Sequence, residues 1–337
     1  MLILLFVASI LLIALIYFQS KNLILIDTPF GHIHKSPYNK NTPLSGGVYL
    51  FIIITAYINL ADNSSNSILI SLFIFAMLIL GIFSDLRRNF SPRLRLILQF
   101  IIVLIFILSI NLEINKTGIF FLDYFINNNM FNLFFTSFCI TIIINGSNFC
   151  DGVNCNTIGY YLAITLSILF TNLPYQEILP EVKVLIIIFS VLYVANLFQK
   201  CFLGDNGSYV ISAFMSFYII TFINLNDNIS PLLAVNLLWY PAFENLFTII
   251  RRAISNKKVQ IADRSHLHIL IFEKISNKNS MMFSNSITGI ILNLIMFLGI
   301  FLSVNFYNNA KVLLLILLIN VILYVISYYF FYVRKKN

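Results

Sequence analysis

Charged residues are scarce in this sequence. Asp, Glu, Lys and Arg together make up 10% of the 337 residues, whereas hydrophobic residues make up 59% and the mean hydropathy is +0.90. A soluble globular domain carries about 25% charged residues, so the composition excludes a soluble enzyme. No internal repeat and no appended soluble domain is visible in the sequence.

Cysteine is also rare. The sequence has Cys139, Cys150, Cys155 and Cys201, too few and too irregularly spaced for a disulfide framework, and three of them fall on what we predict to be the reducing cytoplasmic side. The spacing between Cys150 and Cys155 is too wide for a standard zinc pair. We therefore predict neither a disulfide nor a zinc site.

Long hydrophobic runs fill the sequence instead. Runs of about 18 or more apolar residues are typical of transmembrane helices, and only helices or closed barrels satisfy the backbone in lipid. The first run is not followed by a small-residue cleavage site, so we expect a retained helix rather than a signal peptide. The prediction is an all-α integral membrane protein, a single-domain polytopic bundle over residues 1–337 with about 11 transmembrane helices. These span approximately residues 2–19, 46–60, 66–83, 95–111, 131–145, 157–173, 183–198, 208–225, 230–250, 286–304 and 312–333.

The positive charges divide unequally between the two predicted sides of the membrane. With eleven spans, 18 of the 21 Lys and Arg residues fall on one side, and only Lys116, Lys183 and Lys311 fall on the other. The positive-inside rule assigns the richer side to the cytoplasm, which places the N-terminus outside and the C-terminus in the cytoplasm. The net charge of +8 is then explained by topology and by anionic lipids, so no nucleic-acid partner is expected.

The polar residues that could carry chemistry gather on the same predicted cytoplasmic side. All four histidines fall there, close to short segments that contain glycine and aspartate. Carboxylates can hold Mg²⁺ beside phosphates, and glycine lets backbone N–H groups approach phosphate oxygens. Together these groups are suited to metal-assisted phosphoryl transfer between a substrate in water and one in lipid. The five stretches concerned are "IDTPFGHIHKSPYNKNTPLSGGVYL" (26–50), "GIFSDLRRNFSPRLRL" (81–96), "NGSNFCDGVNCNTIG" (145–159), "FLGDNGSYV" (202–210) and "RRAISNKKVQIADRSHLHIL" (251–270).

In this order, the five stretches resemble the loops of the polyprenyl-phosphate N-acetylhexosamine-1-phosphate transferases. That family includes the undecaprenyl-phosphate GlcNAc-1-phosphate transferases and the phospho-N-acetylmuramoyl-pentapeptide transferases, and "FLGDNGS" is the most specific match. The resemblance implies transfer of a sugar-1-phosphate from a UDP-sugar to undecaprenyl phosphate, with release of UMP. It also implies Mg²⁺ as cofactor, with Mn²⁺ as an alternative ion, a bacterial inner-membrane location with a cytoplasmic site, and a homodimer.

The resemblance implies three catalytic residues, Asp85, Asp205 and His266, with Asp205 and Asp151 as metal ligands. The alternative for Asp205 is an N-cap of the following helix, and for Asp85 a solvated charge cluster with Arg87 or Arg88. Whether Asp85 accepts a proton, orients the lipid phosphate or binds metal is left open. So is the choice between direct displacement and an aspartyl-phosphate intermediate.

Further residues are implied in substrate binding: Asn148, Asp151, Asn154, Phe202, Arg264, His268 and Lys35. The alternatives are turn formation for the third stretch, an interface anchor for Phe202, and inert interfacial histidines. Lys40 competes with Lys35 for the phosphate contact. Glu244 lies inside a predicted span, where an acidic residue is expensive; we expect it to pair with Arg251, seven residues further along the same helix face.

The sequence departs from the family pattern at two places. Ser84 stands where an aspartate is expected, and the residues from Cys155 to Thr157 replace Gly-Leu-Ala. These departures keep open an inactive family member that serves as a scaffold or as a lipid or nucleotide-sugar binding protein. A transporter is less consistent, because it should carry mid-span charges and repeated halves. The His-Leu-His segment favours an N-acetylhexosamine donor in lipopolysaccharide O-antigen, cell-wall or other surface-glycan synthesis.

Overall fold

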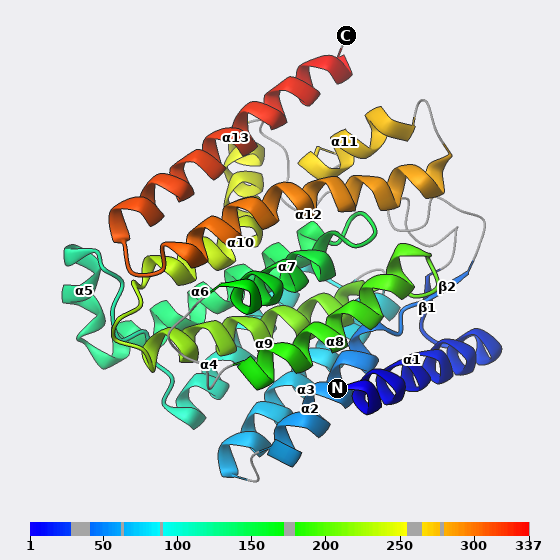
Figure 1. The fold of residues 1–337 in the computed structure, drawn as a ribbon, viewed down its shortest axis with the longest axis horizontal. Coiled ribbons are helices and arrows are strands. Elements are labelled where there is room, and N and C mark those ends of the chain that lie inside the picture. The colour runs from blue at the N-terminus through cyan, green and yellow to red at the C-terminus, as the bar shows by residue number, and fades with distance from the viewer. Residues whose placement is uncertain are drawn as a thin grey trace.

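A computed structural model describes residues 1–27, 41–61, 64–87, 90–171, 179–254, 265–276 and 280–336. Within these residues the fold is all-helical apart from one pair of two-residue strands (Figure 1). The strands β1 (Ile26–Asp27) and β2 (Thr42–Pro43) pair antiparallel. The helices are α1 (Leu2–Asn22), α2 (Gly46–Ala61), α3 (Ser65–Leu86), α4 (Pro92–Ile110), α5 (Phe120–Ile126), α6 (Asn129–Cys150), α7 (Asn156–Phe170), α8 (Leu179–Leu197), α9 (Gly204–Asn224), α10 (Leu232–Ile254), α11 (Leu267–Ser276), α12 (Met281–Asn305) and α13 (Ala310–Lys336).

Nine of the helices in the described part of the chain are long and apolar enough to cross a membrane. Each coincides with one of the predicted hydrophobic runs. Two further runs form the shorter apolar helices α2 and α7, whose lengths fall below the roughly 20 residues that a straight crossing requires. The chain is thus a multi-pass helical membrane protein.

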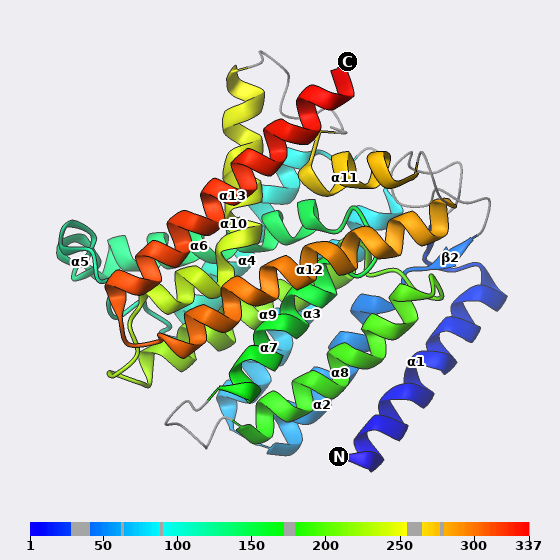
Figure 2. The same cartoon turned by 45° about the horizontal axis from the view of Figure 1, so that its top comes forward.

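Helix α9 lies at the centre of the bundle (Figure 1) and packs against α2, α3 and α6. Of its 18-residue apolar window, 83% is buried inside the protein, against 17% for α1 and for α13. Figure 2 shows α1 at one edge beside α8, with α13 on the other side of the molecule and α12 crossing between them. The two chain ends lie at opposite ends of the molecule in this view.

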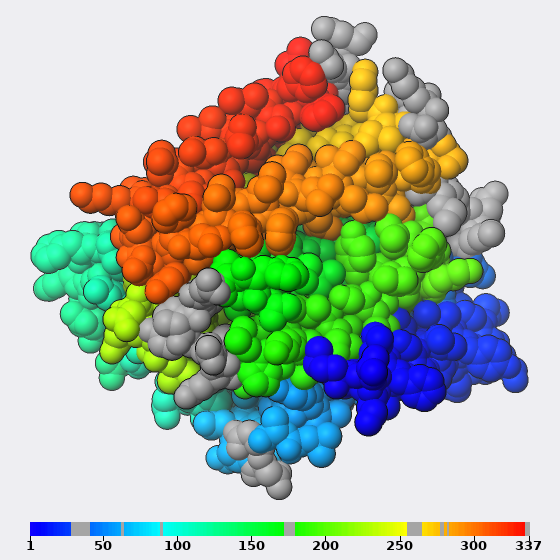
Figure 3. Space-filling model, viewed as in Figure 1, coloured from blue at the N-terminus to red at the C-terminus, as the bar shows by residue number. Residues whose placement is uncertain are grey.

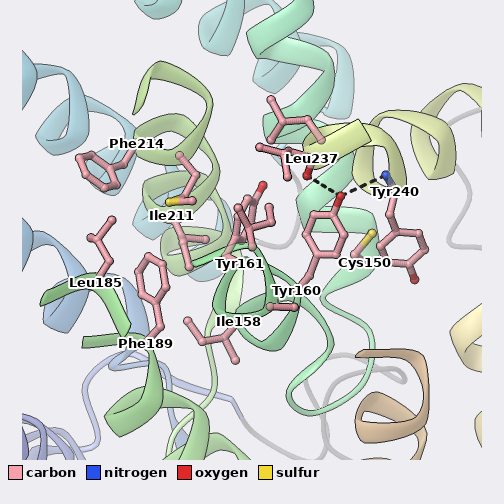
Figure 4. Packing of buried hydrophobic residues seen from close by; sticks show 14 of the residues in the cluster. Cys150, Ile158, Tyr160, Tyr161, Leu185, Phe189, Ile211, Phe214, Leu237 and Tyr240 are labelled. Carbon is pink, nitrogen blue, oxygen red and sulfur yellow. Dashed lines mark hydrogen bonds between the residues drawn. The ribbon is translucent and has the colours of Figure 1, made fainter. Parts of the chain in front are cut away.

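Pro241 interrupts the hydrogen bonding of α10, and a buried tyrosine compensates for it. Proline has no N–H group, so the carbonyl four residues earlier, that of Leu237, loses its helical donor. The hydroxyl of Tyr160 on α7 donates to this carbonyl at 2.7 Å (Figure 4). The backbone N–H of Tyr240 donates in turn to the Tyr160 hydroxyl at 3.4 Å. The break in α10 is therefore satisfied inside the core, which fixes α10 against α7 close to Cys150 at the end of α6.

Candidate active site

The N-terminus of α9 is held by a carboxylate from another helix. Asp85, in the last turn of α3, accepts hydrogen bonds from the backbone N–H groups of Asp205 and Asn206, both at 3.0 Å, and from the Asn206 side-chain amide at 2.7 Å. The first N–H groups of a helix have no partner within it, and the helix dipole favours a negative charge there. Asp85 therefore caps α9, so the proposal that Asp205 is the N-cap is wrong: Asp205 is the second residue of the helix.

Asp205 faces a hydroxyl and a guanidinium group. Its Oδ2 accepts from the Ser84 hydroxyl at 2.6 Å and pairs with Arg95, at the start of α4, at 3.1 Å. Arg95 also donates to Ser84 at 3.1 Å. Asp205 is buried, with 7% of the residue's surface exposed. A second aspartate at position 84 would place two negative charges side by side here, whereas Ser84 donates a hydrogen bond.

The first stretch packs directly against the fourth. The backbone N–H of Phe202 donates to the Pro43 carbonyl at 2.9 Å, and the N–H of Gly47 donates to the Asn206 side chain at 2.9 Å. A Cβ at Gly47 would overlap Asn206, so glycine permits this approach of α2 to α9. Phe202 is buried with Leu25 and Leu44; it is not an exposed interface anchor.

The third stretch lies between the fourth stretch and α12. Asn148, in the last turn of α6, accepts a 3.5 Å hydrogen bond from Ser208 on α9. Asp151 follows α6 as its C-cap and lines a small pocket with Asn154 and Phe202. Asn154 also anchors the loop, because its backbone N–H donates to Asn285 at 2.7 Å and its amide to Ser286 at 3.2 Å. The structure thus gives Asn154 a structural role in addition to its place in the pocket.

His266 is fixed by a buried carboxylate from α10. Its Nδ1 lies 2.8 Å from an oxygen of Glu244, and the hydroxyl of Tyr324 on α13 donates to the other oxygen. The expectation that Glu244 pairs with Arg251 is not met, since both Glu244 oxygens are used by His266 and Tyr324; the Arg251 guanidinium lies 5.8 Å from the Tyr328 ring. With Nδ1 engaged, Nε2 is the nitrogen of His266 that remains for a ligand.

His268 packs against the third stretch rather than presenting a charge. Its ring stacks on His266 with centroids 5.5 Å apart, and a Cβ at Gly152 would overlap its Nε2. The side chain is 1% exposed, and neither ring nitrogen has a hydrogen-bond partner among the described residues. Burial, followed by the proximity of His266, lowers the pKa of His268 to about 3. In this arrangement His268 is neutral and cannot offset phosphate charge as a cation.

The depressed pKa of His268 predicts acid sensitivity. In the unfolded protein the His268 imidazole has its ordinary pKa of about 6.5 and therefore binds more protons than in the folded protein. The free energy of unfolding consequently falls as the pH drops below that value. From about pH 7.5 to about pH 5 the loss is about 2 kcal/mol. We expect the melting temperature of the detergent-solubilised protein to fall over this range, and to fall less in His268→Leu. An equal fall in both proteins would contradict the assignment.

Glu244→Gln is expected to misplace His266. The amide can still bond to Tyr324, but it removes the carboxylate that fixes the imidazole, and a misplacement of about 1 Å reduces turnover by about 10²-fold. We expect a reduced rate of catalysis with little change in substrate affinity. Glu113→Gln, in the loop after α4, serves as the matched control. A Glu244→Gln enzyme with the activity of the control would show that the pair does not position His266.

Two residues implied in substrate binding, Arg264 and Lys35, lie outside the described residues. The structure brings the others together with residues that the sequence did not single out. Arg95 counts in the sequence only among the positive charges of the predicted cytoplasmic side, although its place in the first turn of the helix that follows Ser84 and Asp85 is a usable signal. Asn206 and Tyr324 carry no sequence signal of their own, because their partners are remote in the chain.

Known proteins resemble part of this chain. Residues 67–223 match the family described as Glycosyl transferase family 4. The chain is 26% identical over 254 residues to the probable undecaprenyl-phosphate N-acetylglucosaminyl 1-phosphate transferase of Bacillus subtilis, covering 70% of this chain and 67% of the relative. It is 24% identical over 237 residues to the undecaprenyl-phosphate alpha-N-acetylglucosaminyl 1-phosphate transferase of Salmonella typhi, covering 68% and 65%.

The protein of the same description from Thermotoga maritima is 23% identical over 252 residues, and the match covers 72% of each chain. The chain therefore matches about two thirds to three quarters of the length of these relatives. The matched segment contains the α3 end, the third stretch and the start of α9, which the structure joins through Asp85, Asp205 and Asn148. Motifs and relatives agree, and the central part of the chain, residues 67–223, is similar to glycosyl transferase family 4.

Proposed function

We propose that this protein transfers a sugar-1-phosphate, specifically an N-acetylhexosamine-1-phosphate, from a UDP-sugar to undecaprenyl phosphate. An oxygen of the lipid phosphate attacks the β-phosphorus of the UDP-sugar. The bond from that phosphorus to the bridging oxygen breaks, UMP leaves, and undecaprenyl-diphospho-sugar forms. This product would supply the first membrane-bound intermediate of a surface glycan.

The observation that carries this proposal is the meeting of all five polar stretches. The first contacts the fourth through Gly47 and Asn206, and the second contacts the fourth through Asp85. The third contacts the fifth through Gly152 and His268. The third and fourth share a pocket. Carboxylates, amides and a fixed imidazole thus converge from segments that are far apart in the sequence, which a purely structural membrane bundle does not require.

The site's donors fit a magnesium ion shared with substrate phosphates. Asp205 and Asp151 supply the hard oxygen ligands that Mg²⁺ prefers. Within the described parts of the chain, no group of three or more His, Cys, Asp or Glu side chains could hold an ion by itself. Mg²⁺ commonly takes one or two carboxylates and completes its shell with water and substrate phosphates. When bound, the ion would offset the negative charge of the diphosphate; Mn²⁺ could replace it.

The chain's own residues position the substrates and the side chains of the site. Asp85 holds the start of α9, whose N-terminus favours an anion, and it is our candidate to orient the lipid phosphate. Arg95 and Ser84 fix the rotamer of Asp205. His266 offers Nε2 to the phosphate of the leaving UMP. We favour direct displacement, because both oxygens of Asp85 accept hydrogen bonds from α9, and Oδ2 of Asp205 accepts from Ser84 and Arg95.

The proposed setting is the bacterial inner membrane, with this site at the cytoplasmic face and a homodimer as the assembly. The excess of Lys and Arg in the loops on the side of the site supports that orientation. Undecaprenyl phosphate would then enter from the bilayer and the nucleotide sugar from the cytoplasm. Protease protection of tags at the two termini in oriented vesicles tests this arrangement.

The decisive assay uses membranes that contain the protein, undecaprenyl phosphate, Mg²⁺ and a panel of radiolabelled UDP-sugars. We expect label from one N-acetylhexosamine donor to move into the lipid phase, with UMP released in equal amount and transfer lost on chelation by EDTA. No transfer from any donor, beside an active relative assayed in parallel, would instead support an inactive binding member, and Ser84→Asp would be the first variant to examine.

A further inference from the structure

A buried tyrosine hydroxyl without a hydrogen-bond partner lies one helical turn from Asp205. Tyr209 follows Asp205 by four residues on α9, and positions four apart share one face of a helix. Helical side chains tilt toward the helix N-terminus, so the phenol points back toward the level of Asp205. Tyr209 is 0% exposed. It belongs to a helix that other helices cover: α1, α8, α12 and α13 form the near face of the molecule in Figure 3.

The surroundings of Tyr209 are apolar on one side and polar on the side of the candidate site. Its ring belongs to an apolar cluster with Met77 and Leu80 of α3. The charge of Asp205 acts on the hydroxyl, and Ser84 lies within range to exchange a hydrogen bond with it. As the two hydroxyls stand, they do not meet the geometry of a hydrogen bond, and the hydroxyl of Tyr209 has no other partner among the described residues. An unpaired polar group away from water is unfavourable, so a small adjustment that joins the two hydroxyls is favoured.

Ser84 has one hydrogen-bonding position left in the described part of the chain, and it is an acceptor. A serine hydroxyl carries one proton and two acceptor lone pairs. The proton is donated to Asp205 at 2.6 Å, and one lone pair accepts from Arg95 at 3.1 Å. The second lone pair is open to a donor, and Tyr209 holds a proton that lacks an acceptor. The two groups are therefore complementary.

We propose that Tyr209 is a positioning residue of this site, whose hydroxyl donates to Ser84 so that the proton of Ser84 stays directed at Asp205. Donation to Ser84 polarises its hydroxyl and strengthens the hydrogen bond that Ser84 makes to the carboxylate. Serine can transmit the effect because it both accepts and donates, whereas an ionised aspartate at position 84 could only accept. The resulting chain fixes the rotamer of Asp205 from inside the bundle. Its role in holding Mg²⁺ rests on the proposed function; the hydrogen bond itself does not.

The first test measures the hydrogen bond through the unfolding of the full-length protein in detergent. Removing a hydroxyl that lacks a partner is neutral or stabilising, whereas removing one that donates is destabilising. We expect Tyr209→Phe to lower the melting temperature by about 2 °C, both in the wild type and in Ser84→Thr, which keeps the acceptor. In Ser84→Ala, where the acceptor is gone, Tyr209→Phe should leave the melting temperature unchanged or raise it. A Tyr209→Phe protein as stable as the wild type, or the same fall in all three backgrounds, would overturn the proposal.

The second test measures how well Asp205 is prepared for Mg²⁺. Loss of a group that orients a metal ligand typically reduces metal affinity or activity 10- to 100-fold. We expect Tyr209→Phe to raise the half-saturating Mg²⁺ concentration by about tenfold, read both from the transfer rate and from the rise in melting temperature that Mg²⁺ causes. Tyr218→Phe removes another buried hydroxyl of α9, roughly 14 Å further along the helix, and should change neither value.

The two tests separate this inference from the proposed function. An unchanged Mg²⁺ dependence in Tyr209→Phe would overturn the positioning role. If the wild-type protein transfers label from no UDP-sugar, the proposed function fails, whereas the melting temperatures of the Tyr209 and Ser84 variants still decide whether the hydrogen bond exists.

Discussion

Asp205→Asn is expected to reduce sugar-1-phosphate transfer by at least about 10³-fold, a loss typical of removing a preorganised electrostatic group. The amide keeps the size of the side chain but cannot offset a bound cation. It also turns a good acceptor for Ser84 and Arg95 into a weaker one. The measurement is the initial rate of label entering the lipid phase, at saturating donor and over a range of Mg²⁺ concentrations.

Asp227→Asn, just beyond the opposite end of α9, is the matched control for loss of a carboxylate. The folded state of both variants is compared by melting temperature, so that a loss of activity is not confused with a loss of fold. Residual transfer within tenfold of the control would remove Asp205 from the catalytic machinery. A defect in Asp205→Asn that high Mg²⁺ corrects would assign the residue to ion binding alone.

Asp85→Asn is expected to lower both activity and stability. The carboxylate accepts three hydrogen bonds from the first turn of α9, and an amide would turn an NH₂ group toward those donors. One donor left unsatisfied costs about 1–3 kcal/mol, and displacement of Asp205 by about 1 Å reduces the rate by about 10²-fold. Melting temperature and initial transfer rate are measured on the same preparation.

A second variant separates capping from proton transfer. The double variant Asp85→Asn with Asn206→Asp restores the hydrogen bond between the two side chains, with the amide and the carboxylate exchanged. The backbone N–H groups of Asp205 and of residue 206 still lack the carboxylate at position 85. If Asp85 acts through the cap, the double variant stays as impaired as the single one. Recovery of activity would show that a carboxylate near this point suffices. Asp123→Asn, on the remote helix α5 (Figure 1), controls for general loss of charge.

The membrane-spanning helices are the part of the fold that the sequence predicts well. Each hydrophobic run corresponds to a helix, because apolar composition over a long segment is a local property. The short α11 lies in a stretch that we expected to be a polar loop, and the α5 helix is too short for its pattern to stand out. The β1–β2 pair depends on contacts across residues 28–40 that no local pattern encodes. Span number and orientation in the membrane stay predictions.

For the candidate site, the sequence predicts which residues gather but not how they pair. Glu244 illustrates the difference. Helical spacing makes Arg251 its natural partner, yet α10 turns Glu244 toward His266, whose position is set by packing of the fifth stretch on Phe149 and Gly152. Likewise, Asp85 meets α9 only because α3 and α9 pack together. Such pairings arise from tertiary packing, which overrides preferences along one helix.

The central burial of α9 has a mechanical consequence. Changes in bilayer thickness or lateral pressure act first on helices that touch lipid, such as α1 and α13, where only 17% of the apolar window is shielded by protein. Helix α9, with 83% shielded, receives such forces only through its neighbours. The backbone that carries Asp205 is therefore shielded from direct contact with lipid, and forces from the bilayer reach it through the helices packed on α9.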